Sequence, residues 1–377
     1  MSDTKPSTNS QLRTLLRRLW RGLQIPIVAI ITSLILAAIA IILTAQTPAI
    51  GWEKVLRGYW GIVDGALLRG SGRTNTLVAM TPLILTGLAV AIPFRAGLFN
   101  IGAEGQFMMG ALAGTLTGIY LDLPPVLLAI VVLVAGFVGG ALWGFIPGFL
   151  RARLGSHEVI NTIMLNFIAI AFVNFAVRGP FKDPNPSTVQ TLPIHKAAEL
   201  PRLFGSRLHL GFFVAVLLAV AAYYFLFKTT WGFALRTTGL NKDAAQYAGI
   251  LPWKQYILSM VIGGGLAGVA GIIEVQGITH VLPEGFAAGY GFDAIAVSLL
   301  AVNNPLAIIP AAFVFGALRI GGDFLQIRAG LSVHIVSIFN ALILLFVAAP
   351  AIVRSVFRLK GDDGERTQAT LSRGWGG

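Results

Sequence analysis

Residues Ile25 to Ala45 read IPIVAIITSLILAAIAIILTA and contain no charged side chain. As an α-helix rising about 1.5 Å per residue, this run is long enough to cross a hydrocarbon core of about 30 Å. Arginines precede it, as in a signal peptide, but the run exceeds the usual apolar region of about 7 to 15 residues. Further apolar runs follow, so we predict an uncleaved first membrane helix.

More apolar runs of this kind continue along the chain. They span residues 76–94, 104–121, 125–150, 159–176, 210–227, 256–275, 294–302, 306–325 and 333–353. With 55% hydrophobic and only 12% charged residues, the chain is far more apolar than a soluble domain, in which charged residues make up about a quarter. The sequence therefore predicts an all-α polytopic membrane protein with about ten transmembrane helices.

The net charge of +12 comes from Lys and Arg residues that stand in blocks between the apolar runs. They form no continuous basic face, so they indicate helix-flanking charges and no nucleic-acid partner. Placing the N-terminus in the cytoplasm puts most of them on the cytoplasmic side, which predicts that both termini are cytoplasmic. The expected organisation is a cytoplasmic segment at 1–24, a transmembrane domain at 25–353 with a cytoplasmic loop at 228–255, and a cytoplasmic tail at 354–377. Two longer loops, 46–75 and 177–209, are then external.

Two segments interrupt the apolar pattern with glycine and polar residues, Phe99 to Gln106 and Gly289 to Ala296. The apolar stretch Ala294 to Val302 is too short to cross the membrane as a helix, which predicts a half-helix or re-entrant element. The two breaks fall at equivalent places in two four-helix units that run in opposite directions. These units are candidates for an inverted repeat, whose interrupted helices commonly frame a substrate path near the midplane.

Glycines recur every fourth residue in two of the predicted spans. They are Gly110, Gly114 and Gly118 in one span, and Gly136, Gly140, Gly144 and Gly148 in another. Small residues at this spacing let helix backbones approach closely, so we assign them to helix packing. Gly263 to Gly268 (GGGLAG) also matches a dinucleotide-binding pattern, but it lies within a membrane span with no strand before it and predicts no cofactor.

The chain lacks the residues that several chemistries need. It has no Cys, which excludes disulfides, thiolate metal sites and Cys nucleophiles. No Gly-Lys dipeptide occurs, so a phosphate-binding Walker loop is excluded and any ATP must be hydrolysed by a partner. His157-Glu158 begins like a zinc-protease helix, but Asn161 stands where the second His is required, so we predict no metal site and no catalytic residue.

Polar side chains inside membrane spans are costly and normally face the protein interior or a cavity. The substrate-pathway candidates are Asn100, Glu104, Gln106, Glu158, Asn161, Thr162, Asn166, Glu274, Gln276 and Asp293. For each of them the alternative is a hydrogen bond that locks two helices together, and the sequence favours neither role. Arg319 and Asp323 are four residues apart, which predicts an ion pair within one helix.

The segment Trp231 to Lys254 is more polar than its surroundings. Asn241 to Ile250 (NKDAAQYAGI) predicts a short helix with Asn241 as its N-cap and Gly249 as its stop. Such a helix on a cytoplasmic loop could dock into a groove of another protein, or it could simply connect two spans.

Five segments resemble the permease subunits of ATP-binding-cassette importers in the branched-chain amino acid, ribose and nucleoside group. They are Phe94 to Gln106 (FRAGLFNIGAEGQ), Glu158 to Asn166 (EVINTIMLN), Gly239 to Ile250 (GLNKDAAQYAGI), Gly265 to Gly271 (GLAGVAG) and Gly291 to Val297 (GFDAIAV). The similarity covers nearly all of the chain from Thr76 to Val353. The run Asn100 to Gln106 makes the chain most similar to the nucleoside permeases, often labelled simple-sugar permeases.

This resemblance implies a multi-pass protein of the bacterial plasma (inner) membrane that carries nucleosides inward. It implies a coupling helix that contacts a cytoplasmic ATPase, with Asn241, Asp243, Ala244, Ala245, Tyr247 and Gly249 as its residues. It also implies a second permease subunit, expected to form a heterodimer, and an extracytoplasmic substrate-binding protein. The first helix and the loop 46–75 fit the longer of the two permease partners.

Three alternatives to ATP-driven nucleoside import are consistent with parts of the sequence. The substrate could be a simple sugar or a branched-chain amino acid, because polar uncharged groups and Phe residues suit each of them. An ion-coupled secondary transporter would need no ATPase. An intramembrane hydrolase would need a converging nucleophile and base, and none of the five His residues lies in a recognisable catalytic motif.

Overall fold

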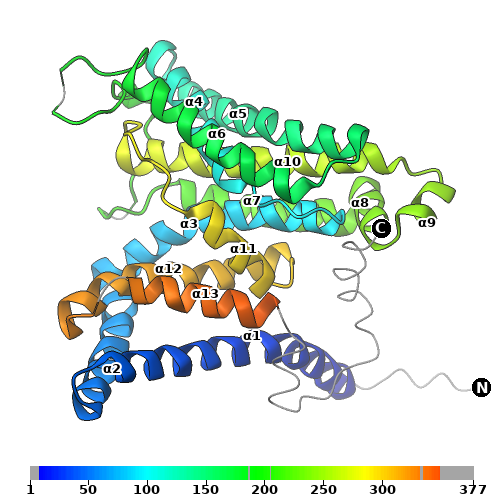
Figure 1. The fold of residues 1–377 in the computed structure, drawn as a ribbon. Helices are drawn as coiled ribbons and strands as arrows, with labels where there is room; N and C mark the ends of the chain where they lie inside the picture. Colours follow the sequence, from blue (N-terminus) through cyan, green and yellow to red (C-terminus); the bar gives the residue numbers. More distant parts are fainter. Residues whose placement is uncertain (1–7, 186, 204, 332–333, 349–377) are drawn as a thin grey trace, which may run out of the picture.

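The computed structural model describes residues 8–185, 187–203, 205–331 and 334–348, and within them the chain forms a bundle of helices (Figure 1). The predicted tail 354–377 lies outside the described residues. The helices are α1 Thr8–Thr44, α2 Pro48–Val63, α3 Gly70–Arg95, α4 Ala103–Tyr120, α5 Pro125–Leu154, α6 Glu158–Arg178, α7 Gly211–Lys228, α8 Thr230–Leu240, α9 Lys242–Tyr247, α10 Pro252–Glu274, α11 Tyr290–Leu300, α12 Pro305–Ala329 and α13 His334–Ala348, with short helical turns η1 Asp64–Leu68, η2 Lys196–Ala198 and η3 Val275–Thr279.

Within the described residues, each predicted apolar run falls on a separate helix, which confirms an all-α polytopic membrane protein. Residues 333 and 349–353 of the last run lie outside the described residues. In the described part of the chain, 7 helices are long and apolar enough to cross a membrane, namely α1, α3, α5, α6, α7, α10 and α12. The remaining apolar runs form α4 and the shorter helices α11 and α13. The 11 residues of α11 extend only about 16 Å, so this element is a half-helix, as the sequence predicts.

One of the two predicted external loops is largely helical. Residues 46–75 contain α2, η1 and the start of α3. Thr47 caps α2 by accepting a hydrogen bond from the Ile50 N–H, and Pro48 occupies the first helical position. A cap followed by proline is a helix-start signal that outweighs the lower hydropathy of this segment.

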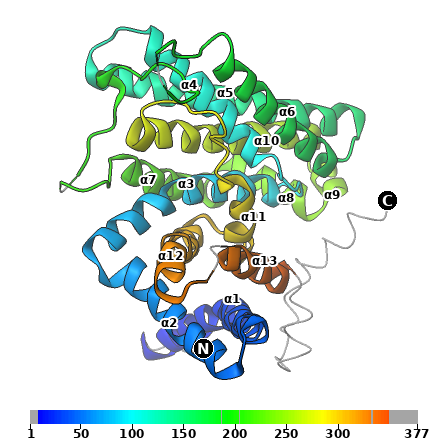
Figure 2. The same ribbon diagram turned by 60° about the vertical axis from the view of Figure 1, so that its left-hand side comes forward.

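At the centre of the bundle, the first helix of each predicted four-helix unit packs against helices of the other unit (Figures 1 and 2). The first helix of each unit, α3 or α10, is mostly buried. Helix α10 packs mainly on α4 and α5 of the first unit, whereas α3 packs on α11 and α12 of the second. The last helices also correspond, because α6 packs on α4 and α13 packs on α11. Two units related by an inverted repeat would pack in this way.

Backbone contact between glycines joins α4, α5 and α10. A Cβ atom on Gly140 of α5 would lie 2.2 Å from the Gly264 carbonyl oxygen and 2.8 Å from the Gly268 Cα. A Cβ atom on Gly110 of α4 would lie 2.1 Å from the same Gly268 Cα. The structure therefore confirms that the glycine repeats serve helix packing.

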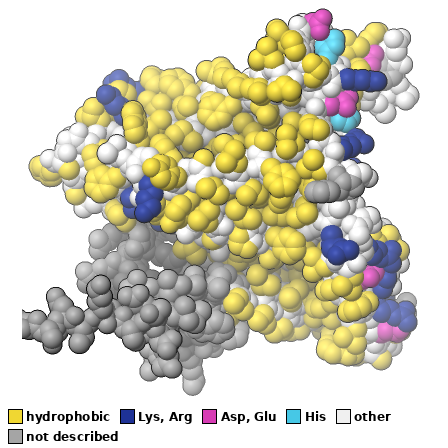
Figure 3. Space-filling model, turned by 180° about the vertical axis from the view of Figure 1, so that it is seen from behind, with side chains coloured by type: hydrophobic (Ala, Val, Ile, Leu, Met, Phe, Trp, Pro, Cys, Tyr) yellow, Lys and Arg dark blue, Asp and Glu magenta, His cyan; other side chains and the backbone are white. Residues whose placement is uncertain are grey.

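The surface has the pattern of a protein embedded in lipid. Figure 3 shows hydrophobic side chains over the middle of one face, with Lys and Arg toward both ends and Asp and Glu toward one of them. Large apolar side chains such as Val134 on α5 and Phe167 on α6 are exposed on the surface of the bundle. An apolar belt between two charged rims matches a bilayer and its headgroups.

The two ends of the bundle carry different features (Figure 1). Helix α9 and the start of α1 lie at one end, whereas α2 and the loop between α6 and α7 lie at the other. Among the described residues, the start of α1 and the loop 228–255, both predicted to be cytoplasmic, thus share one end, and the two loops predicted to be external share the opposite end.

His209, in the loop just before α7, is buried against Gly211 and Gly277. Burial lowers the pKa of His209 from 6.5 to about 4, helped by the charges of Arg202 and His280. A base whose pKa is depressed by folding is neutral in the folded state, so its stabilising effect is complete above pH 6.5 and is lost as the pH falls toward 4.

We therefore expect the free energy of unfolding to fall by about 3 kcal/mol between pH 6.5 and pH 4 because of this one residue. Thermal unfolding of detergent-purified protein across this pH range measures the change, with His209→Gln as the variant that lacks the titrating ring. An identical pH dependence in the variant would show that His209 is not its source.

Candidate functional site

The two breaks predicted from the sequence meet inside the protein. The carboxylate of Glu104, in the first turn of α4, accepts hydrogen bonds from the backbone N–H groups of Gly289 at 2.9 Å and Gly291 at 2.6 Å. Gly291 lies so close that a Cβ atom on it would be 2.2 Å from the Glu104 nitrogen. An acidic side chain at a helix N-terminus stabilises the free N–H groups there, so Glu104 joins the start of α4 to the start of α11.

Hydrogen bonds within the first break hold its conformation. Asn100 donates to the carbonyl oxygen of Ala89 at 3.0 Å, and its side-chain amide is bonded to that of Gln106. Asn166 on α6 accepts from the Gly105 N–H and donates to the Ile101 carbonyl, both at 2.8 Å. These buried amides therefore fix the backbone between α3 and α4 against α6.

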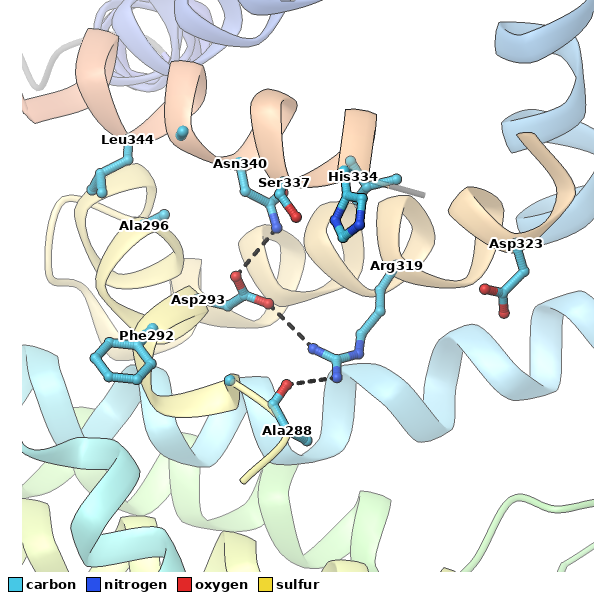
Figure 4. Close-up of a pocket in the computed structure, with 13 residues that line it drawn as sticks. Ala288, Phe292, Asp293, Ala296, Arg319, Asp323, His334, Ser337, Asn340 and Leu344 are labelled. Atoms are coloured by element: carbon cyan, nitrogen blue, oxygen red, sulfur yellow. Dashed lines mark hydrogen bonds and ion pairs between the residues drawn. The ribbon is translucent and has the colours of Figure 1, made fainter. Parts of the chain in front are cut away.

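The second break centres on an ion pair (Figure 4). Arg319 of α12 lies 3.3 Å from the carboxylate of Asp293, donates to the Ala288 carbonyl at 2.8 Å, and has its guanidinium 4.2 Å from the centre of the Tyr290 ring. Asn340 of α13 donates to the other oxygen of Asp293 at 3.2 Å. Three elements, α11, α12 and α13, are thus connected through one carboxylate.

The predicted ion pair between Arg319 and Asp323 is wrong. Arg319 reaches across to α11 instead, and Asp323 lies apart from it in Figure 4. The reason is that the guanidinium has five donors. On α11 and in the loop just before it, the guanidinium finds a carboxylate, a carbonyl and an aromatic face together. Its own helix offers only a carboxylate.

A cavity of about 560 Å³ lies between α11, α12 and α13. It is lined by Ala288, Gly289, Phe292, Asp293, Ala296, Arg319, Asp323, His334, Val336, Ser337, Asn340, Ala341 and Leu344. Among the ten pathway candidates, Asp293 is the one that lines it. The sequence reasoning missed Asn340 and Ser337, although a polar side chain within the apolar run 333–353 was a signal that could have found them.

The other candidates lie elsewhere, with partners of their own. Their contacts are Glu158 with Arg151 at 3.4 Å, Thr162 with the Glu158 carbonyl at 2.8 Å, Asn161 with the Ser156 hydroxyl at 2.6 Å and Gln276 with the Ala198 carbonyl at 2.7 Å. Glu274 is half-buried at the end of α10. The charge of Arg319 acts on Glu274, so Glu274 lies near the second break. The structure does not bring the other four residues of this group together with Asp293.

Helix α9 forms as predicted between Asn241 and Gly249. The Asn241 side-chain oxygen accepts from the N–H groups of Asp243 and Ala244, both at 3.0 Å, and Gly249 has a φ of 78°. Ala245 is buried, whereas Tyr247 is 95% exposed. A large aromatic side chain that projects from a protruding loop is available to a partner protein.

The Glu104 contact provides a test of how the two breaks are joined. Glu104→Leu would leave the N–H groups of Gly289 and Gly291 without acceptors in a buried place, so we expect a loss of about 2 to 4 kcal/mol of stability. Glu104→Gln keeps one acceptor oxygen and should lose less. Thermal unfolding in detergent compares the two variants, and equal melting temperatures for Glu104→Leu and the native protein would contradict this role.

Comparison with known proteins agrees with this architecture. Residues 72–348 match the family described as branched-chain amino acid transport system / permease component. The chain is 38% identical to the guanosine ABC transporter permease protein of Bacillus subtilis over 89% of this chain and 95% of that one. It is 35% identical to the nucleoside ABC transporter permease protein of Lactococcus lactis over 94% and 98% of the two chains, and 34% identical to the glucose ABC transporter permease protein of Haloferax volcanii over 87% of each. No solved structure matches the chain.

Proposed function

Because the chain belongs to the family of permease components of branched-chain amino acid transport systems, we propose that it is the membrane subunit of an ATP-binding-cassette importer that carries nucleosides into the cell. The observation that supports this substrate is the identity of 38% and 35% to a guanosine permease and a nucleoside permease over nearly the full length of each. As a transport component, the chain is no enzyme, and ATP hydrolysis is the task of a partner ATPase.

We propose that the ATPase contacts α9. The helix is held in shape by its Asn241 cap and protrudes at the end of the bundle that also carries the start of α1 (Figure 1). Asp243, Ala244 and Tyr247 are exposed on it. A short helix inserted into a groove of the ATPase would transmit movement of the ATPase to α8 and α10, which flank α9 in the chain.

The remaining partners in the proposal are a substrate-binding protein on the outside and a second permease chain, different from this one. The helices α1 and α2 precede the residues that match the family, 72–348. Such an N-terminal extension suits the longer member of a permease pair. In this arrangement the end with α9 and the start of α1 faces the cytoplasm, and the chain is a multi-pass protein of the plasma membrane.

Transport would follow from two states of the path, each open to one side of the membrane. Glu104 contacts Gly291, so the start of α4 and the start of α11 lie next to each other inside the bundle. ATP-driven closure of the partner ATPase would shift one four-helix unit against the other, and we propose that the shift occurs around this contact.

Substrate competition tests the proposal. The complete transporter, with its ATPase, second permease and binding protein, is reconstituted in proteoliposomes, and ATP-driven uptake of tritiated guanosine is measured with unlabelled competitors. We expect adenosine and uridine to compete, and glucose and leucine to have no effect.

A sugar is the second candidate substrate, because the glucose permease of Haloferax volcanii is 34% identical to this chain. Uptake of labelled glucose without uptake of guanosine would show that the sugar is correct and that the nucleoside proposal is wrong.

A further inference from the structure

We propose that the cavity between α11, α12 and α13 is a nucleoside-binding subsite on the transport path, with the base at its apolar end and the ribose hydroxyls at Asp293 and Asn340. This inference rests on the proposed function and adds a location and a binding mode. The volume of about 560 Å³ lies within the range of about 300 to 1,000 Å³ that small-molecule sites occupy.

The charges in the cavity favour a neutral ligand. Arg319 and Asp293 form an ion pair at 3.3 Å, and Arg319 is held further by the Ala288 carbonyl and the Tyr290 ring. Because Arg319 and Asp293 already neutralise each other, an ionic ligand would have to displace one of them. Asp323, which also lines the cavity and lies apart from Arg319 in Figure 4, would repel an anionic ligand. A neutral molecule with hydroxyl groups can instead use the lone pairs and N–H donors that the pair leaves unused.

The lining divides into two ends, which Figure 4 shows. Phe292, Ala296 and Leu344 lie on one side, and Arg319 lies on the other, with Asp293 and Asn340 between them. An apolar or aromatic group suits the first end and hydroxyl groups suit the second. A nucleoside has both parts, whereas a free sugar would leave the apolar end without contacts.

Asn340 has an unused acceptor in this place. Its amide nitrogen donates to Asp293, while its buried side-chain oxygen has no hydrogen-bond partner in the described part of the chain. A buried acceptor without a partner costs about 1 to 3 kcal/mol. The oxygen is shielded from solvent, so a ligand hydroxyl recovers that energy when the Asn340 side chain turns toward the cavity.

The cavity lies next to the contact around which the two four-helix units are proposed to shift. Gly289 lines the cavity, and its N–H group also donates to Glu104 at 2.9 Å. All the described residues that line the cavity belong to the second unit. The first unit holds the start of α11 through the contact between Glu104 and Gly289. A shift between the two units would therefore change the shape of the cavity, which is what a subsite with two affinities requires.

Adjacent leucines on α13 provide a matched test. Leu344 lines the cavity, whereas Leu345 is 51% exposed on the outer side of the helix. In proteoliposomes with the complete transporter, we expect Leu344→Trp to fill the apolar end and reduce ATP-driven guanosine uptake at least tenfold, and Leu345→Trp to leave it within about twofold. Asn340→Ala should raise the KM for guanosine roughly tenfold while the ATPase still copurifies.

A second readout does not depend on transport. An azido-substituted adenosine, activated by light in the complete transporter, should label peptides of α11 or α13, and guanosine but not glucose should prevent the labelling. Equal guanosine uptake by Leu344→Trp and Leu345→Trp, or labelling confined to other helices, would overturn the subsite and leave the proposed function intact. Lack of nucleoside uptake by the native transporter would overturn the proposed function and the subsite with it.

Discussion

We expect the Gly140→Leu substitution to abolish most of the yield of folded protein. A Cβ atom at this position would lie 2.2 Å from the Gly264 carbonyl oxygen, and that atom belongs to a helix backbone that cannot move aside like a side chain. Overpacking of a side chain into a close-packed interior costs about 1 to 3 kcal/mol, and we expect more here because α5 would have to separate from α10. The yield of monodisperse protein after detergent extraction measures the loss.

Val138→Leu is the matched control, because Val138 on the same helix is 46% exposed at the surface of the bundle. Its yield should equal that of the native protein. A normal yield of Gly140→Leu would mean that α5 and α10 do not pack backbone to backbone, and the central arrangement of the bundle would have to be revised.

Introducing acidic residues on the exposed side of α9 will separate the chain from its ATPase. Ala244→Glu combined with Tyr247→Glu replaces a small and an aromatic contact with charges, and neither side chain supports the fold, since Tyr247 is 95% exposed. Aromatic residues at the centre of an interface often contribute 2 kcal/mol or more, so we expect copurification of the ATPase and ATP-driven uptake to fall more than tenfold.

Tyr120→Glu serves as the control for this variant. Tyr120 ends α4 and is also exposed, and the following loop to α5 lies at the opposite end of the bundle from α9 (Figure 1). Its complex with the ATPase should be intact. Retention of the ATPase by the α9 double variant would contradict the coupling role.

Local features of the fold could be predicted from the sequence because their causes lie close together in the chain. The Asn241 cap and the Gly249 stop act within one short helix, and both are present in the structure. The glycine repeats also predicted close packing, since a spacing of four places small residues on one side of a helix. The helix α2 was missed because hydropathy dominated the prediction, although Thr47 and Pro48 signalled its start.

The contacts that build the cavity could not be predicted in the same way. Arg319 pairs with Asp293 across two helices, and Asn340 reaches the same carboxylate from a third. Local spacing favoured Asp323 as the partner of Arg319, because no property of the sequence shows which helices become neighbours. The role of Glu104 as the joint between α4 and α11 depends on the same long-range packing.

The claim on which the account depends is that this chain is a membrane conduit driven by a separate ATPase. The most direct test measures tritiated guanosine uptake into proteoliposomes that contain either the chain alone under an imposed proton or sodium gradient, or the complete transporter with ATP. We predict uptake only with the complete transporter and hydrolysable ATP. Gradient-driven uptake by the chain alone would contradict the claim and would identify a secondary transporter.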